Sequence, residues 1–401
     1  MLTNRQLFLL HLGQTSLAPM MLEIVRAEGI YMFDPDGKKY IDLISGVSVS
    51  NTGHCHPKVV EAVKKQVDLY MHLMVYGEII QNPQVKYAER LTGLLPPVLN
   101  SCYFVNSGSE AVEGALKLAK RYTGKSRIIS FKNSYHGSTH GALSIQGSEL
   151  YRNAFRPLLP DTFQIGFNDE KSLDAIDKNT ACVIVEPVQG EAGIIYPEND
   201  FLLKIRKRCD ATGALLIFDE IQTGFGRLGH MFAIGRFGVV PDILLLAKAL
   251  GGGMPLGAFI SSAEIMSTLI TNPSLGHITT FGGHPVSCAA GLASLNVIID
   301  EKLTENCNSK SALFKKELIH SLIAEVRGEG LLMAVQLTDP SYIEYVIAHA
   351  PEYGLVLDYF LFCDNAFRIA PPLIISENEI FRATELLKEL LDDAANNSKN
   401  K

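Results

Sequence analysis

The sequence Pro241-Asp-Ile-Leu-Leu-Leu-Ala-Lys248 is a short apolar run that ends in a lysine, and Gly251-Gly-Gly253 follows it closely. A continuous apolar run of this length predicts a strand buried on both faces, as in a largely parallel sheet. Lysine is rarely fully buried unless it is paired or bonded. Burial lowers the pKa of an ammonium group, and the neutral amine is a nucleophile toward aldehydes. Lys248 is therefore a candidate for a chemical role.

A second apolar run, Ala214-Leu-Leu-Ile-Phe218, ends in Asp219. An acid and an amine at the ends of two neighbouring buried strands form an arrangement that suits pyridoxal phosphate. In such a site, Lys248 holds the aldehyde of the cofactor as a Schiff base, and Asp219 holds the pyridinium nitrogen. The two runs together predict a pyridoxal-phosphate site.

Runs of the same kind alternate with helical patterns between residues 100 and 262. The other runs are Cys102–Val105, Arg127–Phe131, Cys182–Val185 and Gly257–Ser261. Helices are predicted over Ser109–Arg121, which Gly124 follows, and over residues 58–74. The apolar residues in register on the second helix are Val60, Val63, Val67 and Met71. This alternation predicts an α/β fold, with a large domain whose mostly parallel sheet is flanked by helices.

The C-terminal part of the chain has a different pattern, with long helices and a short strand. The strand is predicted at Leu331–Leu337, and the last helix begins with a capping box, Ser376-x-x-Glu379. A smaller α+β domain fits this pattern. We divide the 401 residues into an N-terminal segment that packs with the small domain, a large cofactor-binding domain and the C-terminal small domain. Their bounds are 1–45, 46–289 and 290–401, and residues 396–401 are expected to fray.

Composition and charge narrow the class of protein. Apolar residues make up 47% and charged residues 20%, as in an ordinary globular enzyme. The net charge is −7 and no basic stripe occurs, so nucleic acid is not an expected partner. No run of apolar residues is long enough to span a membrane. The seven cysteines form no Cys-x-x-Cys pair, which favours free thiols in a reducing compartment, the cytoplasm.

Polar motifs follow the apolar runs, and ligands of open parallel sheets bind beyond the carboxyl ends of the strands. Asn106-Ser-Gly-Ser-Glu110 opens a helix, so its small residues and free amide groups suit a phosphate. Tyr135-His136-Gly137 offers an aromatic face for a ring. Glu186 and Gln222 follow two further runs, and Gln222 could reach a ring hydroxyl.

This order of motifs resembles the class III, or omega, aminotransferases, pyridoxal-phosphate enzymes of fold type I. They include ornithine, acetylornithine and 4-aminobutyrate aminotransferases. The resemblance runs from Gly29 to Pro372. It rests on Phe218-Asp-Glu-Ile-Gln-Thr-Gly224 through Lys248, Gly53-His-Cys-His-Pro57, Asn106-Ser-Gly-Ser-Glu-Ala111, Thr280-Phe-Gly-Gly283 and Arg368-Ile-Ala-Pro-Pro372.

The resemblance implies an enzyme that moves an amino group from an amine or amino acid, expected to be a terminal amine, to a keto acid by a ping-pong mechanism. It also implies a homodimer with shared active sites. Lys248 would be the Schiff-base lysine and proton carrier, and Asp219 the partner of the pyridinium. The residues implied to bind the cofactor are Ser107, Gly108, Ser109, Tyr135, His136, Glu186, Asp219, Gln222, Lys248 and, from the other subunit, Thr280. No metal is implied.

The chain departs from the family where substrates bind. Ser138 stands where many glutamate-using members have an arginine that holds a substrate carboxylate. Val47 lies near the place of a substrate-binding tyrosine in ornithine aminotransferases. Both departures argue against ornithine and acetylornithine as substrates. The candidate substrate residues are Arg368, Glu191, Tyr76 and Val47. Among them, Glu191 is expected to pair with Arg368 as a gate when no substrate carboxylate is bound.

Other interpretations stay open at this point. A mutase, racemase or decarboxylase could use the same cofactor and fold. Gly224-Phe-Gly-Arg-Leu-Gly229 matches a dinucleotide fingerprint, which makes an NAD-dependent oxidoreductase a more distant alternative, but Glu220–Thr223 separate it from the strand. Gly137-Ser-Thr-His-Gly141 mimics a nucleophile elbow without a supporting triad. His54-Cys-His56 favours a structured loop over a metal site.

Overall fold

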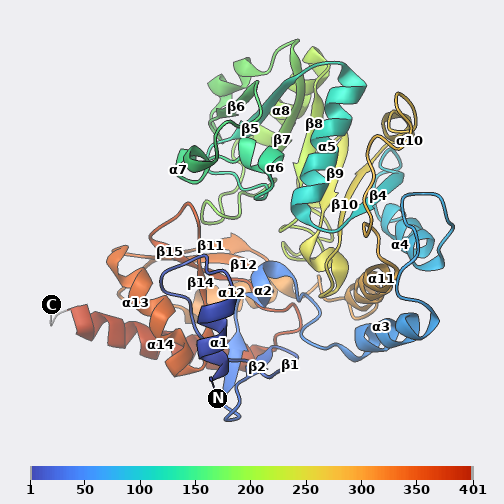
Figure 1. Cartoon of the computed structure of the whole chain (residues 1–401). Coiled ribbons are helices and arrows are strands. Elements are labelled where there is room, and N and C mark those ends of the chain that lie inside the picture. Colours follow the sequence, from blue (N-terminus) through green and yellow to red (C-terminus); the bar gives the residue numbers. More distant parts are fainter. Residues whose placement is uncertain (1, 399–401) are drawn as a thin grey trace.

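A seven-stranded sheet is the largest sheet of the computed structural model, which describes residues 2–398, and lies in the upper part of Figure 1. Its strand order is β4-β10-β9-β8-β7-β5-β6. These strands are β4 (Ser101–Val105), β5 (Arg127–Phe131), β6 (Thr162–Ile165), β7 (Thr180–Val185), β8 (Leu215–Asp219), β9 (Ile243–Leu246) and β10 (Gly257–Ser261). Only β10 runs antiparallel to its neighbours, β4 and β9. The predicted mostly parallel sheet is confirmed, and β6 is an additional strand.

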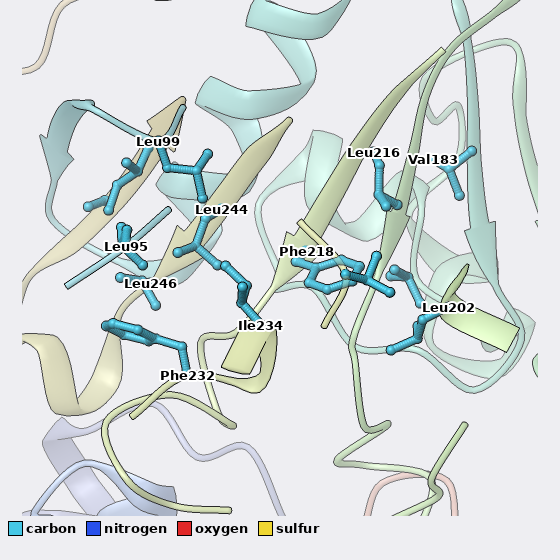
Figure 2. Packing of buried hydrophobic residues seen from close by; sticks show 14 of the residues in the cluster. Leu95, Leu99, Val183, Leu202, Leu216, Phe218, Phe232, Ile234, Leu244 and Leu246 are labelled. Atoms are coloured by element: carbon cyan, nitrogen blue, oxygen red, sulfur yellow. The ribbon is translucent and has the colours of Figure 1, made fainter. Parts of the chain in front are cut away.

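Both faces of this sheet are buried, which explains the continuous apolar runs. Leu216 and Phe218 of β8 lie in one hydrophobic cluster with Leu244 of β9 (Figure 2), whereas Leu215 and Ile217 lie in a cluster on the other face. Successive side chains of a strand point to opposite faces, so a strand covered on both sides has no polar face. Helix α5 (Gly108–Thr123) packs into the second cluster and α8 (Phe201–Thr212) into the first.

Helix α5 confirms the predicted Ser109–Arg121 helix, because it ends at Gly124, whose φ of 68° is left-handed. The other helices around the sheet are α2 (Ser45–Ser48), α3 (Pro57–Leu69), α4 (Asn82–Thr92), α6 (His140–Ser144), α7 (Glu149–Arg152), α9 (Ala233–Phe237), α10 (Ala263–Ser267) and α11 (Pro285–Asp300). Short 3₁₀ turns are η1 (Asn153–Phe155), η2 (Glu170–Ala175) and η3 (Lys248–Gly251).

The predicted helix over residues 58–74 is wrong at its C-terminal end. Helix α3 stops at Leu69, because Tyr70 is extended. Its buried residues are Val59 and Gln66, whereas Val67 is 42% exposed and Met71, beyond the helix, is 60% exposed. The apolar residues at the end of this pattern, Val67 and Met71, therefore lie on a surface that the single chain does not bury.

Two four-stranded sheets complete the fold. One has the order β11-β12-β15-β14 and the other β1-β2-β3-β13. Their strands are β1 (Arg26–Glu28), β2 (Tyr31–Phe33), β3 (Lys39–Asp42), β11 (Ile323–Glu329), β12 (Leu332–Leu337), β13 (Leu355–Val356), β14 (Asp358–Tyr359) and β15 (Ala366–Ile369). The helices on this side are α1 (Asn4–His11), α12 (Cys307–Glu317), α13 (Ser341–His349), η4 (Ala350–Tyr353) and α14 (Glu377–Ser398). Most of these elements contribute to a hydrophobic cluster of their own, whereas α1 buries no residue.

The parallel pairing of β3 with β13 joins the N-terminal segment to the C-terminal part of the chain. The division at residues 45/46 and 289/290 stays a prediction, and its second boundary falls inside α11. No helix of the described residues is long and apolar enough to cross a membrane.

The capping box of the last helix is confirmed: the Ser376 hydroxyl accepts from the Glu379 amide at 3.3 Å, and the Glu379 carboxylate accepts from the Ser376 amide at 2.8 Å. Residues 396–398, expected to fray, are helical instead, because the Asn397 side chain donates to Tyr345 at 2.6 Å and to Asp393 at 3.1 Å. Residues 399–401 lie outside the described residues.

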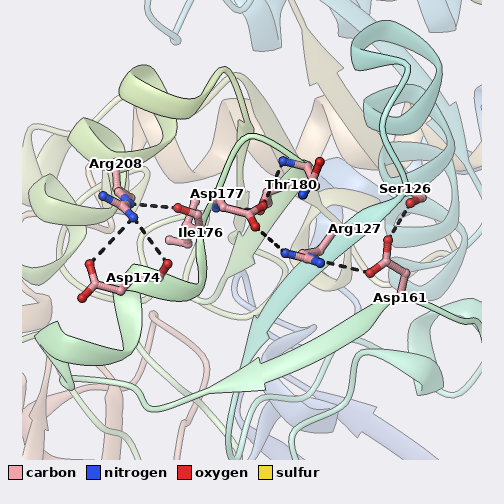
Figure 3. A network of polar contacts seen from close by, with 9 residues as sticks. Ser126, Arg127, Asp161, Asp174, Ile176, Asp177, Thr180 and Arg208 are labelled. Carbon is pink, nitrogen blue, oxygen red and sulfur yellow. Dashed lines mark hydrogen bonds and ion pairs between the residues drawn. The ribbon is translucent and has the colours of Figure 1, made fainter.

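A charged network ties together the starts of the parallel strands. Arg127, the first residue of β5, contacts Asp161 at 3.3 Å and Asp177 at 2.6 Å (Figure 3). These two aspartates precede β6 and β7. The network occupies the amino ends of the strands and leaves their carboxyl ends to the site.

Candidate active site

A cavity of about 390 Å³ lies at the carboxyl ends of β4, β5, β7, β8 and β9. Its lining brings together ten of the residues singled out from the sequence. They are Ser107, Gly108, Ser109, Tyr135, His136, Glu186, Glu191, Asp219, Gln222 and Lys248. The strand order therefore assembles one site from five separate sequence motifs.

Lys248 follows β9 and opens on this cavity, with its side chain half-buried. The pKa of its ammonium group is lowered from the usual value, mainly because of burial. The nearby carboxylates of Glu191, Asp219 and Glu186 act in the opposite direction and raise this pKa. Its φ of 50° is left-handed, a strained backbone conformation for a lysine. The strain directs an amine of reduced basicity into the cavity.

Asp219 ends β8 and is 4% exposed. Its Oδ2 lies 2.7 Å from Nδ1 of His136, and its Oδ1 accepts from the Ile221 amide at 3.1 Å. Each carboxylate oxygen thus has a fixed partner, which holds the group in one orientation. The other ring nitrogen of His136 is buried without a partner. The contact between His136 and Asp219 could not be read from the sequence, since 83 residues separate them.

The start of α5 faces the loop that contains Gly137. Ser107 caps the helix through the Glu110 amide at 3.2 Å, and Ser109 Oγ accepts from the Ser138 amide at 3.2 Å. A Cβ on Gly137 would come within 2.1 Å of Ser109 Oγ, and the φ of Gly137 is 118°. Only glycine allows this close approach. The first turn of a helix presents free amide groups, so the arrangement can cradle an anion.

Glu186 holds the loops around the cavity. Its two oxygens accept from the Tyr135 amide and the Gly190 amide, both at 2.9 Å. Burial raises the pKa of Glu186 to about 7. Gln222 reaches the same place, and its Nε2 is buried without a hydrogen-bond partner. An unpaired buried donor of this kind costs free energy until an acceptor, such as a phenolic oxygen, binds to it.

These observations fit pyridoxal phosphate. The cradle suits its phosphate, and the orphaned amide of Gln222 suits its ring oxygen. Asp219 is a buried carboxylate for its ring nitrogen, and Lys248 is the amine for its aldehyde.

At one end of the cavity, Glu191 pairs with Arg368 of β15. The Arg368 Nη2 to Glu191 Oε1 distance is 2.6 Å, and Glu191 Oε2 accepts from the Leu361 amide at 3.1 Å. The structure adds a residue that sequence reasoning missed: Asp358 Oδ2 lies 3.5 Å from Nη1 of Arg368. Residues 358 and 368 face each other only because β14 and β15 pair in that register.

Four predicted residues lie outside the lining of this cavity. Arg368 reaches it only through its ion pair with Glu191. Thr280 is exposed, and Tyr76 lines a separate pocket with Thr279. Val47 does not line the cavity, although Val49 does.

Two motifs that suggested other functions, the Gly224–Gly229 segment and the His54–His56 segment, make structural contacts. The segment from Gly224 to Gly229 opens no helix, and its Arg227 is fully buried, donates to the Leu331 carbonyl at 2.9 Å and also donates to Asn51. Burial lowers the pKa of Arg227 to about 10. His54 contacts Asp42 at 2.8 Å, and within residues 2–398 no cluster of metal-ligating side chains occurs.

A family model described as aminotransferase class-III matches residues 13–391. The chain belongs to the class III aminotransferases. This aminotransferase is 40% identical over 378 residues to the acetylornithine aminotransferase of Methanosarcina acetivorans, which covers 92% of this chain and 91% of the relative. That of Methanopyrus kandleri is 40% identical over 387 residues, 95% of this chain and 96% of the relative.

Solved structures agree with this assignment. The ornithine aminotransferase of Toxoplasma gondii superposes with a TM-score of 0.89 at 30% identity, over 98% of this chain and 94% of that one. An amine transaminase from an uncultivated Pseudomonas species, solved in its PLP-bound form, gives 0.87 at 29% identity, over 96% and 98%. The aminotransferase therefore has fold type I and depends on pyridoxal phosphate, as the sequence predicted.

Proposed function

We propose that this aminotransferase takes an amino group from a terminal amine and passes it to a keto acid, with Lys248 and Asp219 as its catalytic residues. The observation that carries the proposal is the placement of Lys248, an amine of lowered pKa, in one cavity with the buried carboxylate of Asp219.

Bound pyridoxal phosphate supplies an electron sink for the carbanion left when the substrate loses its α proton. The residues of the chain do the rest. Asp219, held by His136 and the Ile221 amide, keeps a negative charge where the ring nitrogen needs a proton. Lys248 Nζ would hold the aldehyde of the cofactor, and as a free amine it would accept the proton that leaves the substrate carbon and return it. Positioned proton transfer contributes ~10²–10⁴-fold in rate.

Other residues hold the cofactor. Gly108 and Ser109 would hold the phosphate, Tyr135 would cover the ring, and Gln222 would donate to the ring oxygen. Glu186 fixes the Tyr135 loop through the amide bond described above. Glu191 and Arg368 form the gate that accepts either a neutral substrate end or a carboxylate.

The donor differs from that of the relatives named as acetylornithine aminotransferases. Ser138 is exposed and lies 3.2 Å from the Tyr135 hydroxyl, so no guanidinium is available at the place where family members hold a carboxylate. A terminal amine without that carboxylate fits the site better than acetylornithine.

We further propose a homodimer in which Thr280 of each subunit completes the phosphate site of the other. Thr280 is exposed and outside the cavity of its own chain, which supports this arrangement. All seven cysteines are free, and four are buried, which supports a place in the reducing cytoplasm.

Borohydride reduction followed by peptide mapping tests the proposal. The holoenzyme should be yellow, and reduction should fix the cofactor on Lys248. Lys248→Ala should bind pyridoxal phosphate but lose turnover. A label on any other lysine would exclude this function for the site.

A further inference from the structure

Two carboxylates share one guanidinium at the substrate end of the cavity. Arg368, 1% exposed, lies between Glu191 at 2.6 Å and Asp358 at 3.5 Å, and the face of Phe360 lies 4.8 Å from its guanidinium carbon. The positive charge of Arg368 is therefore balanced twice before any substrate arrives.

The two carboxylates differ in how they are held. Glu191 belongs to the segment after β7 and also accepts from the Leu361 amide at 3.1 Å; the proposed gate requires its side chain to move aside for a substrate carboxylate. Asp358 belongs to β14 and stands opposite Arg368 in the strand register, so its backbone stays beside the guanidinium. Burial raises the pKa of the Asp358 carboxyl, the charge of Arg368 lowers it and the charge of Glu191 raises it, as expected for two carboxylates beside one cation.

Lys248 is a nearby cation that interacts with Glu191, but its amine would hold the cofactor aldehyde. Arg327 donates to the Gly193 carbonyl and contacts its own carboxylate, Glu325, at 3.4 Å. The position of the family's second arginine holds Ser138. With Lys248 engaged by the cofactor, two carboxylates, Glu191 and Asp358, would lie against the one guanidinium of Arg368.

We propose that Asp358 sets the donor specificity of this aminotransferase: by neutralising Arg368 it selects amines whose far end is neutral or cationic and disfavours donors with a distal carboxylate. The inference rests on the proposed function of the site. Asp358 acts through Arg368 and is a positioning residue, not a catalytic one.

Three donors of equal chain length test the charge preference: 4-aminobutyrate, butylamine and 1,4-diaminobutane. Single-turnover kinetics, followed at the cofactor absorbance, give the rate constant per donor concentration. In the native holoenzyme, butylamine and 1,4-diaminobutane should react faster than 4-aminobutyrate.

In Asp358→Asn, the rate for 4-aminobutyrate should rise ~10-fold, since a negative charge near Arg368 is gone. Butylamine should change less than ~2-fold, and 1,4-diaminobutane should slow. Asp358→Glu should keep the native order. Asp364→Asn changes an exposed aspartate in the segment between β14 and β15; it is the matched control and should leave all three rates unchanged.

Titration calorimetry with butyrate, which cannot react, measures the same effect without turnover. Butyrate should bind Asp358→Asn holoenzyme ~10-fold tighter than the native holoenzyme, and Asp364→Asn should match the native value. Equal butyrate affinity in the native and Asp358→Asn proteins, or unchanged relative donor rates, would overturn the inference. If no donor reacts, the proposed function is wrong, and the butyrate titration still decides the role of Asp358.

Discussion

At the scale of single residues, we propose that the charge of Asp219 matters most for catalysis. Asp219→Asn keeps the size of the side chain and a contact for His136, but an amide cannot stabilise a protonated ring nitrogen. We expect kcat to fall ~10²–10³-fold, as for the loss of other fixed electrostatic partners in active sites. Steady-state kinetics measure this, with the cofactor spectrum as a check that the variant binds pyridoxal phosphate. Near-normal turnover would show that Asp219 only caps its strand.

Arg368 gives a second test at this scale. Its guanidinium is buried and is the positive group that pairs with Glu191. Arg368→Ala should weaken carboxylate-bearing substrates by ~2–5 kcal/mol of transition-state binding, the cost of losing a buried charged partner. Neutral amines should lose much less. Comparison of kcat/KM for the two kinds of substrate checks this, and equal losses would indicate a purely structural arginine.

Much of the site could be predicted because its residues follow buried strands directly. Lys248, Asp219 and Gln222 lie at strand ends, and parallel strands bring such ends to one edge. Asp358 could not be found in this way. The contact of Asp358 with Arg368 depends on the register of the antiparallel pair β14 and β15. Strand β14 has only two residues, too few for a sequence pattern to predict that register.

At the scale of elements, the strands that are buried on both faces were predicted correctly, whereas the edge strand β6 and the end of the partly exposed helix α3 were not. Strand β6 was missed because it lies at the edge of the sheet and buries only Ile165. Helix α3 was extended too far because the apolar residues after Leu69 continue the period without forming a helix. The spacing of apolar residues predicts that a surface is buried, but it does not indicate which element or which subunit buries that surface.

The capping box of α14 provides a test at the element scale. Ser376→Ala removes the acceptor for the Glu379 amide and should lower the free energy of unfolding by ~1 kcal/mol. Glu389→Ala, an exposed site on the same helix, is the control and should change it by less than ~0.5 kcal/mol. Denaturant titration of the holoenzymes measures both. Equal midpoints for the two variants would show that the cap does not stabilise the helix.

At the scale of the whole molecule, several exposed apolar residues lie in the segments that follow α3 and precede α11, the segments of the proposed subunit interface. Met71 is 60%, Ile80 91% and Phe281 53% exposed. The rings of His72 and Phe281 lie 4.8 Å apart, so the segment after α3 and the Thr280 loop form one surface. Contiguous apolar surface of this kind marks an interface between proteins.

The last prediction follows from that surface. If each site uses Lys248 of one subunit and Thr280 of the other, Lys248→Ala and Thr280→Ala are both impaired alone but complement each other. A hybrid dimer has one site with neither lesion and one with both. Random reassociation of equal amounts makes half of the dimers hybrid, so about a quarter of the native number of intact sites should return. Activity assays after mixing and refolding measure the recovery, and Lys248→Ala refolded alone is the control. Recovery no greater than the sum of the separate variants, or full activity of a monomer in sedimentation analysis, would place Thr280 outside the partner's site and leave each subunit to bind its cofactor alone.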